Sequence, residues 1–235
     1  MTGAEVPAVE PADAPGYHVK VQTLAVGGVD LQIRSLLDRQ QFSDPTGEAE
    51  RAGISSAAWP LFGMVWPSAL VLADAMLRAD LANRRVLEVG CGLALASLVV
   101  QRRHGDITAS DNHPLAQAFL RDNLRRNQLP PLRYATGDWA GGTDTLGRFD
   151  LIIGSDVLYE RLQPAALSQF IEAHALAAVE VLIVDPDRGN RGAFNRCMDV
   201  LGFERSEQKI VALPDGAPYK GRLLSYRRGV RPGLG

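Results

Sequence analysis

The sequence predicts an open, doubly wound α/β sheet of seven strands that ends in an antiparallel strand pair and is preceded by a β-hairpin. Two observations predict this class. Between residues 85 and 201, short apolar runs typical of buried strands alternate with segments whose apolar residues recur at helical spacing. The last two strand-like segments, 203–213 and 221–227, are joined through Pro214-Asp215-Gly216, a turn that predicts an antiparallel pair.

The N-terminal hairpin is expected within residues 17–58. Apolar residues alternate at period two on both sides of Gly27-Gly28, a pair that suits a tight turn between strands. From Asp38 to Ser56 the chain is polar, and loops of this length are usually lids or disordered segments. Residues 1–16 are expected to be a disordered tail and residues 228–235 a frayed one, which leaves 59–227 as the main domain.

The first strand of the main sheet, within Arg84–Ala96, leads into a glycine turn and then a helix. Gly90 and Gly92 let the backbone turn sharply and approach a ligand, and the helix start presents unpaired N–H groups. Glu88 precedes this turn by two residues. A dinucleotide fingerprint would need a third glycine where Leu95 stands, so the glycine spacing alone leaves two interpretations open, a site for a nucleotide-like ligand or a plain tight turn between strand and helix.

Acidic residues follow the second and third strands. Asp111 lies 111 − 90 = 21 positions after Gly90, near the roughly 20 expected for a carboxylate that binds a ribose. The alternative is that Asp111 caps a helix. Asp138 and Trp139 follow the third strand, where an acid can accept from an adenine amino group and an aromatic ring can cover the base.

The fourth strand, 149–155, is continuously apolar and runs into the polar segment Asp156–Glu160. Polar residues past the carboxyl end of a central strand are typical of a catalytic site in such sheets. Upstream, aromatic residues cluster between Trp59 and Trp66, either as core or as a pocket wall, with Trp66 nearer the ligand. Helices are expected after Pro67, the glycine turn, Pro114, Pro164 and Asn190.

Composition excludes several classes of function. Lys and Arg total 25 against 27 Asp and Glu, so no basic excess supports binding to nucleic acid. No apolar run is long enough for a membrane span. Cys91 and Cys197 lack disulfide or metal-site spacing, which predicts reduced thiols and a cytoplasmic protein. The four histidines are scattered, so we expect them at the surface or in loops, with no metal site.

These motifs resemble the family-16 methyltransferases, class I enzymes that use S-adenosylmethionine and include many protein-lysine methyltransferases. The resemblance covers about residues 17–226 and implies the Rossmann-like class I methyltransferase sheet. Its most specific part is the Asp-x-x-Tyr after the fourth strand together with the upstream Gly-x-x-Trp. The matching segments are Gly63-Met-Val-Trp66-Pro-Ser-Ala, Val86-Leu-Glu-Val-Gly-Cys-Gly, Ser110-Asp111, Gly137-Asp138-Trp139 and Phe149-Asp-Leu-Ile-Ile-Gly-Ser-Asp156-Val-Leu-Tyr159-Glu.

The resemblance implies a role for each matching residue. Two departures from the family pattern are Ala94, which could narrow the pocket floor, and Leu93, which removes one hydrogen bond to the cofactor. The implied cofactor contacts are Glu88, Gly90 and Gly92 at the amino-acid end, Asp111 with Asn112 at the ribose, Asp138 and Trp139 at the adenine, and Trp66 and Ser155 beside the cofactor. The implied acceptor contacts are Asp156 and Tyr159.

The expected reaction is methyl transfer to a lysine side chain of a protein substrate. Such an in-line displacement depends on positioning and needs neither a metal nor a covalent intermediate. Asp156 favours the ammonium form of an amine, so we expect it to capture and aim the amine rather than act as the base. A small-molecule N- or O-methyltransferase and a catalytically silent binding protein remain alternatives. A nicotinamide dehydrogenase is disfavoured by Leu95 and the antiparallel end.

Overall fold

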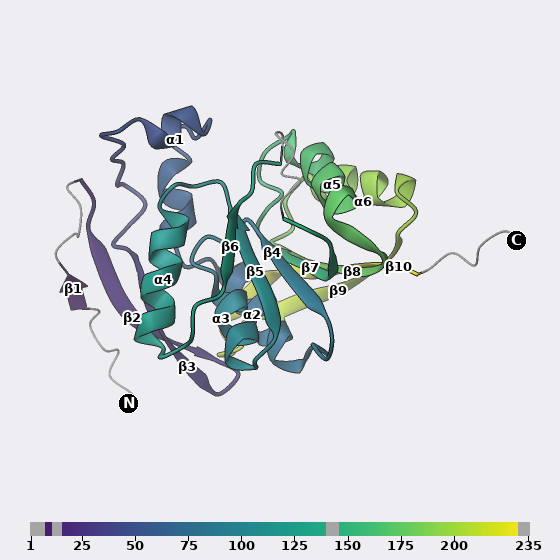
Figure 1. Ribbon diagram of the computed structural model, residues 1–235, viewed down its shortest axis with the longest axis horizontal. Coiled ribbons are helices and arrows are strands. Elements are labelled where there is room, and N and C mark those ends of the chain that lie inside the picture. Colours follow the sequence, from purple (N-terminus) through teal and green to yellow (C-terminus); the bar gives the residue numbers. More distant parts are fainter. Residues whose placement is uncertain (1–7, 11–15, 140–145, 230–235) are drawn as a thin grey trace, which may run out of the picture.

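The computed structural model describes residues 8–10, 16–139 and 146–229, which form one large sheet, a small second sheet and their helices (Figure 1). The large sheet has seven strands in the order β6-β5-β4-β7-β8-β10-β9. Their bounds are β4 (Arg85–Val89), β5 (Asp106–Asp111), β6 (Arg133–Thr136), β7 (Phe149–Ser155), β8 (Ala175–Asp185), β9 (Glu204–Ala212) and β10 (Pro218–Arg228).

The direction of the strands matches the predicted class. Strands β4 to β8 pair in parallel, whereas β10 is antiparallel to both β8 and β9. Only residues 213–217 separate β9 from β10, which is too short a connection for a parallel crossover. The predicted seven-stranded sheet with an antiparallel C-terminal pair is therefore confirmed.

Helices cover both faces of the large sheet (Figure 1). One apolar core lies between the sheet and helices α2 (Pro67–Arg78), α3 (Leu95–Arg102) and α4 (Ala116–Arg126). A second core lies between the opposite face and helices α5 (Gln163–His174) and α6 (Arg191–Val200). Burial on both faces explains why apolar residues occupy consecutive positions in β4 (Val86, Leu87) and in β7 (151–153) instead of alternating with polar ones. No helix in the described ranges is long and apolar enough to cross a membrane.

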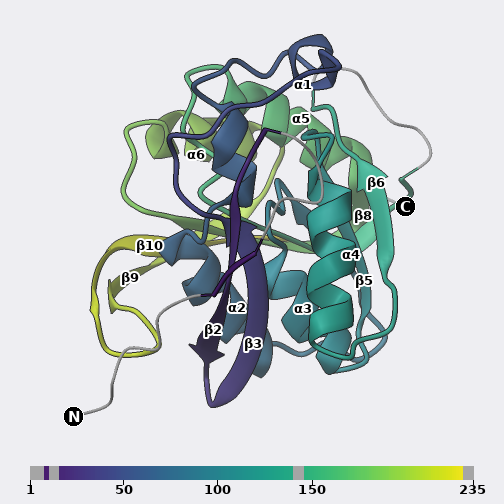
Figure 2. The same cartoon turned by 90° about the vertical axis from the view of Figure 1, so that its left-hand side faces the viewer.

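The small sheet contains the predicted hairpin, β2 (Val19–Val26) and β3 (Val29–Leu36), which packs beside α4 (Figure 2). Asn123 of α4 accepts a hydrogen bond from the Arg34 backbone N–H at 2.8 Å and so joins the two units. A further strand, β1 (Ala8–Glu10), pairs with β2 inside the tail predicted to be disordered. That prediction is wrong for these residues, because pairing along a sheet edge uses backbone groups that need no apolar pattern. Residues 1–7 and 11–15 lie outside the described ranges.

Other boundaries differ from the predicted ones. The polar segment 38–56 contains a short helix, α1 (Glu48–Arg51), and is followed by a 3₁₀ helix, η1 (Trp59–Gly63). Strand β8 begins at Ala175, six positions before the apolar run 181–184 that marks it in the sequence, and β10 runs through Arg228 into the tail predicted to fray. Asn190 precedes α6, but its side chain donates to the Leu158 carbonyl at 2.9 Å instead of capping the helix.

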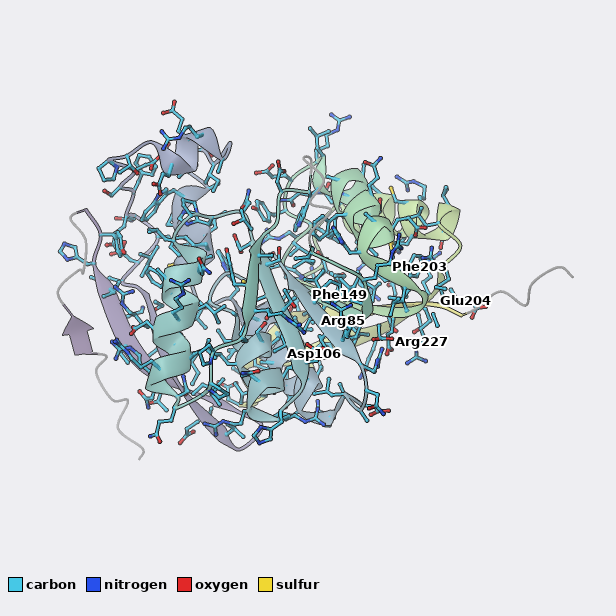
Figure 3. All side chains as sticks on the ribbon, in the orientation of Figure 1. Arg85, Asp106, Phe149, Phe203, Glu204 and Arg227 are labelled. Atoms are coloured by element: carbon cyan, nitrogen blue, oxygen red, sulfur yellow. The ribbon has the colours of Figure 1, made fainter. Side chains whose placement is uncertain are left out.

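The amino ends of the central strands are marked by Arg85, Asp106 and Phe149, the first residues of β4, β5 and β7, which lie close together in Figure 3. The Arg85 guanidinium lies 5.0 Å from the centre of the Phe149 ring and 4.0 Å from the Asp106 carboxylate. Because these strands are parallel, their carboxyl ends gather at the opposite edge of the sheet. That edge carries the predicted site.

Candidate active site

A cavity of about 650 Å³ lies at the carboxyl ends of β4, β5 and β7, covered by the segment around α1 and η1. The structure brings almost all predicted site residues to this cavity. They come from the ends of different strands and from the start of α2, so only the folded sheet places them together. The predicted residues in its wall are Trp66, Gly90, Gly92, Asp111, Asn112, Asp138, Trp139, Ser155, Asp156 and Tyr159.

The glycine turn forms part of this wall, and its backbone conformation and close contacts favour glycine. Gly90 and Gly92 have φ angles of 56° and 52°. A Cβ atom on Gly92 would lie 2.9 Å from the Phe62 carbonyl oxygen, and one on Gly90 would lie 2.8 Å from Val157 Cγ1. A larger residue at either position would therefore have to displace a neighbouring segment of the cavity wall.

Asp111 ends β5 and is held by two backbone hydrogen bonds. Its Oδ2 accepts from the Gly92 N–H at 2.8 Å, and its Oδ1 accepts from the His113 N–H at 2.9 Å. Burial raises the pKa of Asp111, and the backbone hydrogen bonds oppose that rise. Helix α4 begins five residues later, with Leu115 at its N-cap, so Asp111 does not cap it. Each carboxylate oxygen keeps a further lone pair for a ligand hydroxyl.

Glu88 is the one predicted site residue outside the cavity wall. It is 2% exposed, and its Oε2 accepts from the Ser97 backbone N–H at 2.8 Å and from the Ser97 hydroxyl. Burial raises the pKa of Glu88 to about 7, although the bonds from Ser97 oppose that rise. Glu88 thus fixes the first turn of α3 against β4.

The two departures from the family pattern lie in different places. Ala94 is the N-cap residue of α3, with a φ angle of 60°, and is buried outside the cavity wall. It adopts the left-handed conformation in which glycine is unstrained. Leu93 does line the cavity, where it contributes only apolar surface.

The aromatic cluster before α2 divides into core and wall. Trp59 is 1% exposed and packs against Tyr17 and Phe62, with ring centres 5.8 and 5.9 Å away. Trp66 instead lines the cavity, and its Nε1 donates to the Leu61 carbonyl at 2.8 Å. Arg39, whose guanidinium lies 5.7 Å from the Trp66 ring centre, also lines the cavity. No sequence motif marks Arg39, because it belongs to a polar loop without periodicity.

His113 lies in the loop between β5 and α4, as predicted, although it is buried, whereas His174, buried in α5, contradicts the prediction that the histidines lie at the surface or in loops. His113 is 3% exposed, stacks on Phe62 with ring centres 3.7 Å apart, and lines the cavity. Its Nδ1 accepts from the Leu115 N–H at 3.2 Å, and burial lowers its pKa to about 3. The ring is therefore neutral. His174 is buried as well, with Nδ1 2.9 Å from the Gly147 carbonyl oxygen.

Asp156 follows β7 and has a φ angle of 57°, an uncommon conformation for a residue with a side chain. Its backbone N–H donates to the Val184 carbonyl at 2.9 Å, and its Oδ1 accepts from Arg188 Nε at 2.6 Å. Tyr159 is 43% exposed at the same end of the cavity. Arg188 comes from the loop after β8, where no sequence motif marks it.

Three curated relatives are similar to parts of this chain. It is 34% identical to the histone-arginine methyltransferase METTL23 of Xenopus laevis over 42% of this chain and 46% of that protein. It is 28% identical to the protein N-lysine methyltransferase METTL21A of Danio rerio over 50% of this chain and 58% of that protein. It is 30% identical to the EEF1A lysine methyltransferase 3 of Mus musculus over 40% of this chain and 43% of that protein. The chain spans about half the length of the curated relatives it matches.

Solved structures share the fold at low sequence identity. The Thermus thermophilus 16S rRNA methyltransferase RsmC, in complex with AdoMet and guanosine, matches with a TM-score of 0.60 and 14% identity over 95% of this chain and 58% of that one. The Synechocystis magnesium protoporphyrin IX methyltransferase with bound SAM matches with a TM-score of 0.57 and 17% identity over 69% of this chain and 80% of that one. These likenesses show a methyltransferase-type sheet.

The family model described as lysine methyltransferase matches residues 56–192. This range runs from the segment before η1 to the start of α6 and includes every residue of the predicted site. It also agrees with the resemblance drawn from the sequence motifs. The chain belongs to the lysine methyltransferase family.

Proposed function

We propose that this chain is an S-adenosylmethionine-dependent methyltransferase that modifies a lysine side chain of a protein. The observation that carries this proposal is the meeting of two acids at one cavity. Asp111 ends β5 and is fixed against the glycine turn, and Asp156 follows β7, which lies on the other side of β4. Family membership and the similarity to METTL21A and to EEF1A lysine methyltransferase 3 support a lysine acceptor.

The residues of the cavity fit S-adenosylmethionine. A volume of about 650 Å³ is within the range of small-molecule sites. Asp111 would accept from the ribose hydroxyls, with Asn112 beside it, while Asp138 and Trp139 would hold the adenine. The remaining proposed contacts are the backbone of Gly90 and Gly92 and the side chains of Trp66 and Ser155. When bound, S-adenosylmethionine supplies a methyl group on a cationic sulfur.

The acceptor end of the proposed site has to bind a cationic side chain. A lysine has a pKa near 10.4 and must be neutral to attack, so the site has to bind the ammonium and then favour its deprotonation. Asp156 would capture and aim the amine, since a carboxylate stabilises the charged form. The ring of Tyr159 would pack along the stem of the lysine. Glu88 acts as a positioning residue through Ser97 and α3.

Labelled methyl transfer into a cell lysate tests this proposal. We expect the wild-type protein to label the protein fraction rather than the small-molecule fraction, with the label recovered as methyl-lysine after hydrolysis. Asp156→Asn should bind S-adenosylmethionine with a Kd within about threefold of wild type and lose labelling about 10- to 100-fold, because charge-assisted bonds contribute roughly 1.5–3 kcal/mol. Label in small molecules alone, or full activity of Asp156→Asn, would contradict the proposal.

The similarity to METTL23 favours one second candidate, an arginine acceptor. The same hydrolysis distinguishes the two, because methyl-arginine would replace methyl-lysine as the labelled product. We also propose a cytoplasmic location. Cys91 and Cys197 are both free thiols, as expected in a reducing compartment.

A further inference from the structure

A second, smaller cavity of about 380 Å³ lies beside the cofactor cavity. The two cavities share Trp66, Asp156 and Arg188 in their walls. Asp156 therefore borders both cavities, at the place where a group in one could meet a group in the other. The outer wall of the second cavity is built by the start of α2, the loop after β8 and the turn between β9 and β10.

This second cavity has a largely apolar wall with a carboxylate at its inner end. Trp66, Leu213 and Tyr219 contribute apolar surface, together with three prolines. Tyr219 is held in place by its hydroxyl, which lies 2.8 Å from the Ser68 hydroxyl oxygen. An unbranched alkyl stem packs well on such a wall, whereas the charged end of the same side chain needs a polar partner. Asp156 supplies that partner.

Asp156 is already engaged in this structure. Its Oδ1 accepts from Arg188 Nε at 2.6 Å, the Asp156 side chain is 9% exposed, and the Arg188 side chain is 39% exposed. A cation that enters the second cavity must therefore compete with the guanidinium for the carboxylate. Because two cations at one carboxylate repel each other, Arg188 would then leave Asp156, and its unneutralised charge would attract an anionic group nearby.

The loop that carries Arg188 is fixed by its neighbours. The Arg188 backbone N–H donates to Asp185 Oδ1 at 2.9 Å. Asp187 accepts from Arg222 Nε of β10 at 3.0 Å and forms an ion pair with Arg191 of α6. Because the backbone is held on both sides, the partly exposed Arg188 side chain is the part of this loop that can turn.

We propose that the second cavity is the acceptor channel and that Arg188 selects acceptors with an acidic residue beside the methylated side chain. The inference rests on the proposed function, since it assigns the route by which a cationic side chain reaches Asp156. In the free protein the Arg188 guanidinium is paired with the Asp156 carboxylate. When the acceptor cation takes the carboxylate, Arg188 turns outward and pairs with the acidic neighbour. Exposed Lys220, also in the channel wall, supports the same preference.

Peptide binding tests this exchange of ion pairs without requiring turnover. The probes are fluorescein-labelled nine-residue peptides with a central lysine, flanked on both sides by aspartate, by asparagine or by arginine. Their binding to the full chain loaded with S-adenosylhomocysteine is followed by fluorescence anisotropy. We expect the aspartate-flanked peptide to bind at least about tenfold more tightly than the asparagine-flanked one, the ratio that one ion pair of roughly 1.4 kcal/mol provides. The arginine-flanked peptide should bind most weakly.

The control variants assign this preference to Arg188. Arg188→Gln should reduce the preference to within about twofold, whereas Arg196→Gln, which removes an exposed arginine on α6, should leave it unchanged. Circular dichroism and thermal unfolding check that each variant is folded, because Arg188 also lines the cofactor cavity. If Arg188→Gln is not folded, Lys220→Gln is tested in its place. This variant should lose part of the preference for the aspartate-flanked peptide. Equal binding of the three peptides, absence of binding, or a preference that survives these variants would overturn the inference. Methyl transfer into a lysate tests the proposed function independently of this peptide preference.

Discussion

Glu88 of β4 and Ser97 of α3 form a buried pair in which one carboxylate oxygen, Oε2, accepts both the backbone N–H and the hydroxyl of the serine. The pair joins the strand before the glycine turn to the helix after it. Because the carboxylate is withdrawn from water, its protonation state is coupled to folding.

This coupling predicts a pH-dependent stability. The pKa of Glu88 rises from 4.5 to about 7 on folding, so the folded protein holds a proton that the unfolded chain releases between these pH values. The stabilisation is fully present below pH 4.5 and is lost as the pH rises through about 7. The difference corresponds to roughly 3 kcal/mol of unfolding free energy. Urea denaturation of wild type and Glu88→Gln at pH 5, 6, 7 and 8 measures it.

The Glu88→Gln variant is the reference against which the pH dependence of wild-type stability is measured. His113, whose pKa falls to about 3 on folding, acts with the opposite sign between pH 3 and 6.5, but it is present in both proteins and cancels in their difference. Wild type should therefore lose stability relative to Glu88→Gln as the pH rises. Parallel pH profiles for the two proteins would show that Glu88 is already ionised in the folded state at pH 5.

The glycine turn predicts a position-specific cost. Gly92→Ala places a Cβ 2.9 Å from the Phe62 carbonyl oxygen, whereas Gly216→Ala meets no atom within 4 Å, and both glycines have positive φ angles, 52° and 88°. Both variants should lose about 1–2 kcal/mol from the left-handed conformation. Gly92→Ala should lose more, and only this variant should weaken S-adenosylmethionine binding, as measured by calorimetry. Equal stability and unchanged affinity would mean that the turn can relax.

Asp111 should determine cofactor affinity. We expect Asp111→Asn to raise the Kd for S-adenosylmethionine about 10- to 100-fold, since hydrogen bonds to a charged group contribute roughly 1.5–3 kcal/mol. Asp106→Asn is the matched control, because Asp106 begins the same strand at the opposite edge, where it pairs with Arg133. A calorimetric titration in which both variants bind like wild type would remove Asp111 from the ribose site.

Arg39 is predicted to bind the carboxylate at the amino-acid end of the cofactor, because it lies over Trp66 in the cavity wall. Arg39→Gln should weaken binding of S-adenosylmethionine about tenfold, as expected for one exposed charge-assisted hydrogen bond of roughly 1.4 kcal/mol. Binding of methylthioadenosine, which lacks the amino-acid portion, should not change. If both ligands lose affinity equally, Arg39 shapes the cavity without contacting the carboxylate.

Local patterns explain what the sequence could predict. The glycine turn, the acids after the strands and the final antiparallel pair are each encoded within a few consecutive residues, and the parallel sheet brings those acids to one edge. The early start of β8 was missed because Ala175 and its neighbours favour a helix. Pairing with β7 and β10 overrides that preference.

Contacts between distant segments explain what the sequence could not predict. Arg188 reaches Asp156 from a loop 32 residues later, and His113 is buried by stacking on Phe62, which precedes it by about 50 residues. Neither contact leaves a periodic signal in the chain. The second cavity likewise exists only because the β9–β10 turn folds back beside α2.

A crystal structure of the chain with S-adenosylhomocysteine shows directly whether this cavity binds the cofactor. We expect the ribose hydroxyls on the Asp111 carboxylate, the adenine beside Asp138 and Trp139, and the sulfur directed toward Asp156. A ligand bound elsewhere, or bound in this cavity with Asp111 turned away from the sugar, would contradict this expectation.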